Sequence, residues 1–113
     1  MDQIDYVSEI KDGEIPSGSD DGIKLGFTDD ILYGRFEKCG NILYIHFIAS
    51  IYPGQGNVTR LITHLVKDTK FDVRVSRPCT IMKHILGKLG FCEAYENIEY
   101  YNGILTECWR LIE

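Results

Sequence analysis

The sequence predicts an α+β domain built on a mixed, mostly antiparallel central sheet, with a splayed strand pair and two main helices. Three observations lead to this class. Apolar runs joined by short turns predict neighbouring antiparallel strands. Two segments with apolar residues at helical spacing predict helices. The first helix lies between two strands, and such a unit implies a parallel or splayed strand pair in an otherwise antiparallel sheet.

Length and composition predict one domain. A chain of 113 residues, 44% of them hydrophobic, can form a single core. Asp and Glu outnumber Lys and Arg by 17 to 12, which argues against nucleic-acid binding through a broad basic surface. The 4 cysteines form neither Cys-x-x-Cys pairs nor zinc-ligand spacings with histidine, so we expect free thiols and no metal site. Without a basic leader or a membrane-length apolar run, a cytoplasmic protein with no membrane attachment is expected.

The first residues give the weakest pattern. Residues 11–22 are rich in Gly, Ser and Asp, which predicts a loop, and we expect residues 1–22 to be a poorly ordered N-terminal segment. A single folded domain is then expected over residues 23–113. Its first strand is predicted over residues 23–27, where apolar residues alternate with small or polar ones. A second strand is predicted over residues 31–37.

The run over residues 42–51 is nearly continuous and apolar, which predicts a central strand buried on both faces. Alternation would place Tyr44, His46, Ile48 and Ser50 on one face, and that face carries the side-chain polarity of the strand. A reactive site is therefore sought there. Two interpretations of His46 stay open. It is either a hydrogen-bonded core residue or a catalytic group, since an unperturbed histidine pKa of about 6.5 suits proton transfer.

A Pro/Gly turn follows this strand and leads directly into a helix. Residues 53–56 read Pro-Gly-Gln-Gly, and a helix is predicted over residues 59–67 or 59–70. The first N–H groups of a helix lack intrahelical partners and lie at the positive end of its dipole. Glycines let a ligand approach that backbone closely, so the segment is either a phosphate-binding loop or an ordinary turn.

The remaining chain predicts one strand, one helix and a hairpin. A strand is expected over residues 71–76. The second helix starts at Pro78, which suits a first helical turn, and ends at Gly90, which suits the position after the last turn. Asn102-Gly103 lies between extended runs over residues 95–101 and 104–111, and an Asn-Gly pair is a strong hairpin signal.

The order of these elements resembles the GNAT superfamily of N-acetyltransferases, and two segments carry the resemblance. Residues 87–91, Gly-Lys-Leu-Gly-Phe, are similar to the usual end of the last GNAT helix. Residues 53–62 are similar to the acetyl-CoA loop, Gln/Arg-x-x-Gly-x-Gly/Ala followed by two apolar helix residues. The resemblance covers residues 42–112, and residues 23–41 by strand order only.

The resemblance implies an acetyl-CoA-dependent N-acyltransferase that transfers an acetyl group to an unidentified amine. In such a protein the amides of residues 54–60 hold the pyrophosphate, and the backbone of residues 49–52 pairs with pantetheine as an added strand. His46, or a water chain through Ser50, accepts a proton, and water or Tyr100 donates one. The implied cofactor-binding residues are Ile51, Tyr52, Gly54, Gln55, Gly56, Asn57, Val58, Thr59 and Arg60.

Three departures from the family pattern support an alternative. Val58 replaces the last Gly or Ala of the loop, and Leu86 replaces a Tyr that protonates the leaving thiolate in many members. Residues 11–22 cannot hold the two helices that normally follow the first strand. The alternative is a catalytically inactive GNAT-fold protein, of viral or mobile-element type, that binds a host protein.

Two further hypotheses stay open. The first is an unrelated α+β domain, which a chain without strand divergence at residues 49–52 would favour. The second concerns assembly, because exposed strands at the sheet edges would allow a homodimer.

Overall fold

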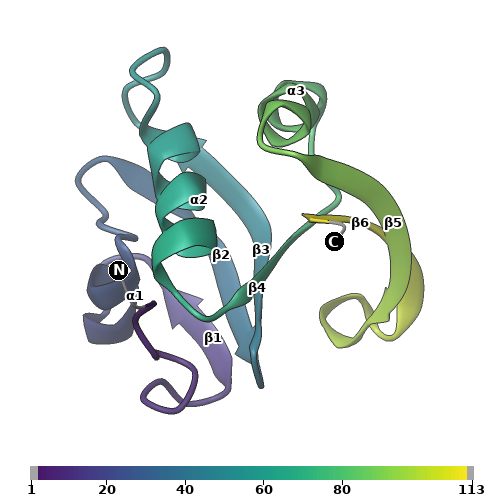
Figure 1. Cartoon of the computed structure of the whole chain (residues 1–113), viewed down its shortest axis with the longest axis horizontal. Helices are drawn as coiled ribbons and strands as arrows, with labels where there is room; N and C mark the ends of the chain where they lie inside the picture. The colour runs from purple at the N-terminus through teal and green to yellow at the C-terminus, as the bar shows by residue number, and fades with distance from the viewer. Residues whose placement is uncertain (1–2, 112–113) are drawn as a thin grey trace.

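The computed structural model describes residues 3–111, which form one six-stranded sheet with helices packed around it (Figure 1). The strand order is β1-β2-β3-β4-β6-β5. The elements in chain order are β1 (Gly13–Pro16), α1 (Asp20–Leu25), β2 (Leu32–Cys39), β3 (Ile42–Ser50), α2 (Asn57–Asp68), β4 (Asp72–Ser76), α3 (Thr80–Lys88), β5 (Phe91–Ile98), the 3-10 helix η1 (Glu99–Tyr101) and β6 (Ile104–Leu111).

The predicted fold class is confirmed. β3 and β4 form a parallel pair, and the other neighbouring strands within residues 3–111 pair antiparallel. The parallel pair arises because α2 carries the chain from the end of β3 back to the start of β4. The paired segment is short and runs from Ile42 opposite Asp72 to Ile45 opposite Val75.

Two secondary-structure predictions near the N-terminus are wrong. Residues 11–22 contain β1 and the start of α1 rather than only a loop. The predicted strand over residues 23–27 is instead the end of α1, up to Leu25, and the two residues after it. Ser19 caps α1 by accepting a hydrogen bond from the Gly22 N–H at 3.0 Å. Gly26, with φ 97°, closes its other end. A helix of 6 residues has too few turns for its period to be told from strand alternation.

The residues before position 23 contribute to the same sheet and core. β1 pairs with β2 along its length. Ile4 forms a parallel bridge with Thr69, just after α2. Ile10 and Ile15 are buried in the same apolar cluster as Leu25 and the sheet. The segment from Ile4 to Pro16 therefore belongs to the sheet and to its apolar core.

α2 lies over one face of the sheet, and α3 lies apart from it beside β5 (Figure 1). Three side chains of α2 are buried, Leu61, Ile62 and Leu65, in one cluster with Leu43 and Ile45 of β3. Burial of a Leu or Ile side chain contributes about 1.5–3 kcal/mol, so this contact fixes the helix on the sheet. The helix begins at Asn57, slightly before its predicted start.

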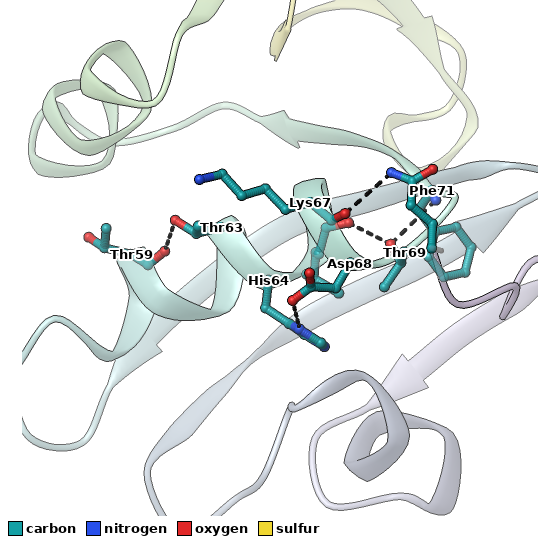
Figure 2. Close-up of polar contacts among 9 residues, drawn as sticks. Thr59, Thr63, His64, Lys67, Asp68, Thr69 and Phe71 are labelled. Atoms are coloured by element: carbon teal, nitrogen blue, oxygen red, sulfur yellow. Dashed lines mark hydrogen bonds and ion pairs between the residues drawn. The ribbon is translucent and has the colours of Figure 1, made fainter. Parts of the chain in front are cut away.

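Polar contacts fix the C-terminal end of α2, as Figure 2 shows. On the outer side of the helix, His64 Nδ1 lies 2.8 Å from Asp68 Oδ2. Just past the helix, the Thr69 hydroxyl donates a hydrogen bond to the Leu65 carbonyl and accepts one from the Phe71 N–H at 3.3 Å. These bonds satisfy backbone groups that a helix end leaves unpaired and define where β4 begins.

The C-terminal hairpin is confirmed, with a longer connection than predicted. β5 and β6 pair from Phe91 opposite Leu111 to Ile98 opposite Ile104. The connection contains η1 followed by Asn102 and Gly103, both in the left-handed region with φ 58° and 72°. In consequence, η1 brings its two tyrosines against the ring of a histidine in β3.

Candidate functional site

β3 and β4 diverge after their short parallel segment. Their last paired residues are Ile45 and Val75, yet β3 continues to Ser50. β4 ends one residue after Val75, and the Arg77 N–H then donates to the Glu107 carbonyl of β6 at 2.9 Å. A splayed strand pair is therefore present. It opens at position 46, before residues 49–52, where the sequence placed it.

The diverging half of β3 has one free backbone edge. The Ile51 N–H donates to the Ile31 carbonyl at 2.9 Å, on the side where β2 lies. Because backbone groups of alternate residues point to opposite edges of a strand, Ile48 and Ser50 direct theirs toward the side that β4 has left. Within residues 3–111, no strand pairs with this edge. An extended chain of amides could bind there as an added strand.

A β-bulge interrupts β3 at His46. Phe36 lies opposite Ile45, whereas the adjacent Arg35 lies opposite Phe47, so His46 is an extra residue in β3. The strand loses its two-residue alternation at this point. Phe47 is 49% exposed as a result, although the sequence predicted a strand buried on both faces.

The sequence predicted that four side chains of β3 share one face, and this prediction is wrong for Ile48 and Ser50. Tyr44 and His46 stay on one face, with their rings stacked 5.5 Å apart. Ile48 instead joins the core, because the bulge shifts the alternation. Ser50 closes a turn by accepting a hydrogen bond from the Tyr52 N–H at 3.1 Å. The polar face that the sequence indicated therefore ends at His46.

His46 is held between a serine and a glutamate. Its Nδ1 lies 2.7 Å from Ser76 Oγ, and its Nε2 lies 3.0 Å from Glu37 Oε1. Ser76 Oγ is in turn 3.2 Å from the Tyr101 hydroxyl. An ionised carboxylate only accepts hydrogen bonds, so Nε2 carries the ring proton and Nδ1 accepts from Ser76. These four side chains form a relay: Tyr101 donates to Ser76, Ser76 to His46, and His46 to Glu37.

Aromatic rings enclose His46 and set its protonation. The side chain is buried, and the residue as a whole is 7% exposed. The Tyr100 ring stacks on it at 3.9 Å, and the Tyr101 ring meets it edge-on at 5.5 Å. Burial lowers the pKa of His46 below its ordinary value, while the hydrogen bond to Glu37 opposes that shift. At neutral pH the imidazole is therefore uncharged and can accept a proton at Nδ1.

The sequence singled out His46 but not the other members of the relay. Glu37 lies in β2 and Ser76 at the end of β4, and only the strand register brings both to His46. One sequence signal could have identified Ser76. It is the last residue of the strand predicted over residues 71–76, which was expected to lie beside the strand that carries His46. Tyr100, considered as an acid, stacks on His46, whereas the Tyr101 hydroxyl joins the relay.

A second polar cluster on the same face is structural. The Tyr44 hydroxyl donates to Glu96 Oε1 at 2.8 Å, and Arg74 pairs with both Glu96 and Asp72. Burial raises the pKa of Tyr44, so it remains a donor. Burial likewise raises the pKa of the Cys108 thiol to about 12, which excludes a thiolate at neutral pH. The cluster ties β5 to β3 and β4.

The predicted cofactor-binding residues lie together within residues 51–60, at the other end of the free edge. Three of them, at the start of α2, are half-buried: Asn57, Val58 and Thr59. The others are exposed: Ile51, Tyr52, Gly54, Gln55, Gly56 and Arg60. The side chains that hydrogen-bond to His46 or stack on it come from β2, β3, β4 and η1. Among residues 3–111 the candidate site thus has two separate parts, a loop and a relay, joined by β3.

α2 starts without a side-chain cap. Gly56 occupies the cap position with φ 72°, and the first turn contains no acidic residue. Asn57 instead donates to Ser50 Oγ at 3.3 Å, and Arg60 hydrogen-bonds to the Asn57 side chain. The positive end of the helix dipole and its first N–H groups therefore lie in an exposed loop beside a guanidinium. This arrangement suits an anion, above all a phosphate.

The two substitutions that depart from the GNAT pattern lie away from the loop surface. Val58 packs against the hydrophobic core. A Cβ built at Gly54 would meet no atom within 4 Å, so the loop is open above its backbone. Leu86 is fully buried and supplies no polar group. The residues present fit a diphosphate at the loop, and a general acid at position 86 is missing.

No family model, curated protein or solved structure matches this chain. Across residues 3–111, no three His, Cys, Asp or Glu side chains gather as metal ligands would. In the same part of the chain, every helix falls short of the length and apolar character that crossing a bilayer requires. We therefore infer function from the geometry of the loop, the free edge and the relay.

Proposed function

We propose that this protein binds acetyl-CoA and transfers its acetyl group to an amine. One observation carries the proposal: the free edge of β3 leads without interruption from the relay at His46 to the uncapped start of α2. The strand from His46 to Ser50 spans roughly 13 Å at about 3.3 Å per residue. A diphosphate at one end and a thioester at the other, joined by an extended amide chain, match this order of features.

Each part of the ligand has a matching group in the chain. The amides at the start of α2 would bind the diphosphate, with Arg60 as a second, charged donor. Gly54 and Gly56 place no side chain over these amides. The outward backbone groups of Ile48 and Ser50 would pair with the amides of pantetheine.

The relay supplies the base. When bound, acetyl-CoA supplies an activated acyl group whose C–S bond breaks as the new C–N bond forms. His46 takes the amine proton at Nδ1, passed through Ser76, and Glu37 stabilises the charged imidazole. Because Leu86 has no proton to give, water would protonate the leaving thiolate. The products are an acetylated amine and CoA.

Calorimetric titration of the purified protein with acetyl-CoA tests the binding part, with 3′-dephospho-CoA as a ligand control. We expect micromolar binding that Gly56→Leu abolishes, because a side chain at the cap position covers the amides. Gly40→Leu is the control for strain at a positive φ: Gly40 has φ 61°, close to the 72° of Gly56, but lies in the β2–β3 turn, where a Cβ would meet no atom within 4 Å. Absence of binding to the wild type at millimolar acetyl-CoA would overturn the proposal.

A second candidate function is binding of a partner protein without catalysis. Exposed aromatic side chains on β2 and β3 favour it, since the Tyr33 and Phe47 rings lie 5.8 Å apart and both are about half exposed. The same titration separates the two functions, because only the first requires acetyl-CoA. The homodimer stays a prediction, which sedimentation would check.

A further inference from the structure

A cavity of about 580 Å³ lies at the end of β4, beside the relay. Tyr101 belongs to both, because its ring lines the cavity and its hydroxyl contacts Ser76. Pro78, Ile104 and Leu105 give the cavity apolar walls. Ile104 and Leu105 are 64% and 61% exposed, so they offer apolar surface to a ligand. The acetyl-CoA loop contributes no residue to this lining.

Arg77 gives the cavity a positive charge. It follows Ser76 directly, and its φ of 48° is uncommon for a residue other than glycine. Its guanidinium carbon lies 5.3 Å from the centre of the Tyr101 ring, within the range of a cation–π contact. The ion pairs formed within residues 3–111 do not include Arg77. The guanidinium is therefore positioned by the ring and available to an anion.

The carboxylate of the lining does not compensate this charge. Glu107 accepts a hydrogen bond from Trp109 Nε1 at 2.7 Å and pairs with Lys83 at 3.2 Å. The Trp109 hydrogen bond, with a further contribution from Lys83, lowers the pKa of Glu107. The negative charge of Glu107 is thus balanced by Lys83, and Arg77 gives the lining a net positive charge.

We propose that this cavity binds the acyl acceptor, and that the acceptor is an amino acid with an apolar side chain. The inference rests on the proposed function. Arg77 binds the carboxylate through two hydrogen bonds, and Ile104 and Leu105 cover the side chain. The amine then lies near Tyr101 and Ser76. Its nitrogen forms the C–N bond as the thioester C–S bond breaks, and its proton passes to His46.

An acceptor pair tests this assignment. L-leucine and L-leucinamide share a side chain and an amine, but only leucine has a carboxylate. With acetyl-CoA and the wild type, we expect a kcat/KM about tenfold to a hundredfold higher for leucine. Arg77→Gln should remove most of this preference, whereas Arg35→Gln, at an exposed arginine of β2 outside the cavity, should keep it. Comparison between variants cancels the difference in amine basicity between the two acceptors.

Binding without cofactor separates this inference from the proposed function. We expect leucine to shift the NMR signals of the Ile104 and Leu105 methyl groups, and Arg77→Gln to abolish the shift. This result would support the cavity even if acetyl-CoA failed to bind. Acetyl-CoA binding without leucine binding would overturn the acceptor assignment alone. Equal use of leucine and leucinamide by the wild type, or an unchanged preference in Arg77→Gln, would also overturn it.

Discussion

The starts of α1 and α2 differ in N-terminal capping, that is, in what accepts hydrogen bonds from the first backbone N–H groups of the helix. Ser19 caps α1 with a side-chain hydrogen bond, and Asp20 and Asp21 place negative charge in its first turn. α2 has Gly56 at the same position, no acid in its first turn and Arg60 nearby. A capped start is stable alone, whereas an uncapped start gains free energy when an anion binds. The start of α2 therefore has the features that the proposed phosphate site requires, whereas the start of α1 does not.

α3 provides an intermediate case. It also starts without a side-chain cap or an acidic first turn, but Cys79 rather than a glycine occupies the cap position, preceded by Pro78. The missing cap alone therefore does not distinguish α2. What distinguishes it is the combination of a glycine loop, a guanidinium and the free edge of β3. The predictions below test this combination, beginning with the largest effect.

Removal of the base should separate catalysis from binding at α2. We expect His46→Ala to lower kcat about 10²- to 10⁴-fold, because Ser76 only passes the proton on and needs the imidazole to receive it. The Kd for acetyl-CoA should stay near the wild-type value, since His46 lies at the far end of the free edge. Steady-state kinetics and calorimetry measure the two effects. Ser50→Ala tests the alternative route through Ser50: a comparable loss of kcat there would contradict the relay.

An acid placed in the first turn of α2 would make it resemble α1. We expect Thr59→Glu to weaken acetyl-CoA binding roughly tenfold through repulsion of the phosphates, yet to stabilise the protein by about 0.3–1 kcal/mol through the helix dipole. Calorimetry and urea unfolding measure the opposite changes. Thr59→Gln, which has the same shape without the charge, is the control. A Kd for acetyl-CoA that is the same in Thr59→Glu and Thr59→Gln would refute the proposal that the loop binds phosphate.

Removal of the cap of α1 is the converse change. Ser19→Ala should reduce the free energy of unfolding by about 1 kcal/mol, because the Gly22 N–H loses its acceptor. The Kd for acetyl-CoA should not change. Ser17→Ala is a matched control, since Ser17 Oγ is buried and has no hydrogen-bond partner within residues 3–111. A weaker Kd in Ser19→Ala would mean that the two helix starts are coupled.

Acidification should produce the smallest effect. The pKa of His46 is lower in the folded protein than its ordinary value of about 6.5, so the folded state binds fewer protons between these two pKa values. The stability due to neutral His46 is complete above about pH 6.5 and is lost as pH falls toward the folded pKa. Urea unfolding of wild type and His46→Ala between pH 5 and 7.5 measures it. A stability difference that is independent of pH would contradict the shift.

Local chemistry and periodicity predicted the chain from residue 42 onward. β3, α2, β4, α3 and the hairpin lie close to their predicted ranges. The strand predicted over residues 23–27 was wrong because a segment this short can have the same apolar spacing in a helix as in a strand. The loop was recognisable because its signals, two glycines and the start of a helical pattern, are adjacent in the sequence. The sequence did not identify the partners of His46, which are Glu37, Ser76 and Tyr101. Their contacts depend on the register between distant segments and on a β-bulge that the residue types do not reveal.

The bulge also bears on whether the fold needs His46. Removing that position from the chain would make Arg35–Phe47 and Phe36–Ile45 consecutive pairs of a regular ladder. The parallel pairing with β4 ends at Ile45, so it would be unaffected. Deletion of the residue would therefore keep the ladders of β3 in register, although it would remove the contacts with Glu37 and Ser76, as a smaller side chain also would. The strand ladders could be built with one residue fewer, and the extra position places the imidazole among Glu37, Ser76 and Tyr100.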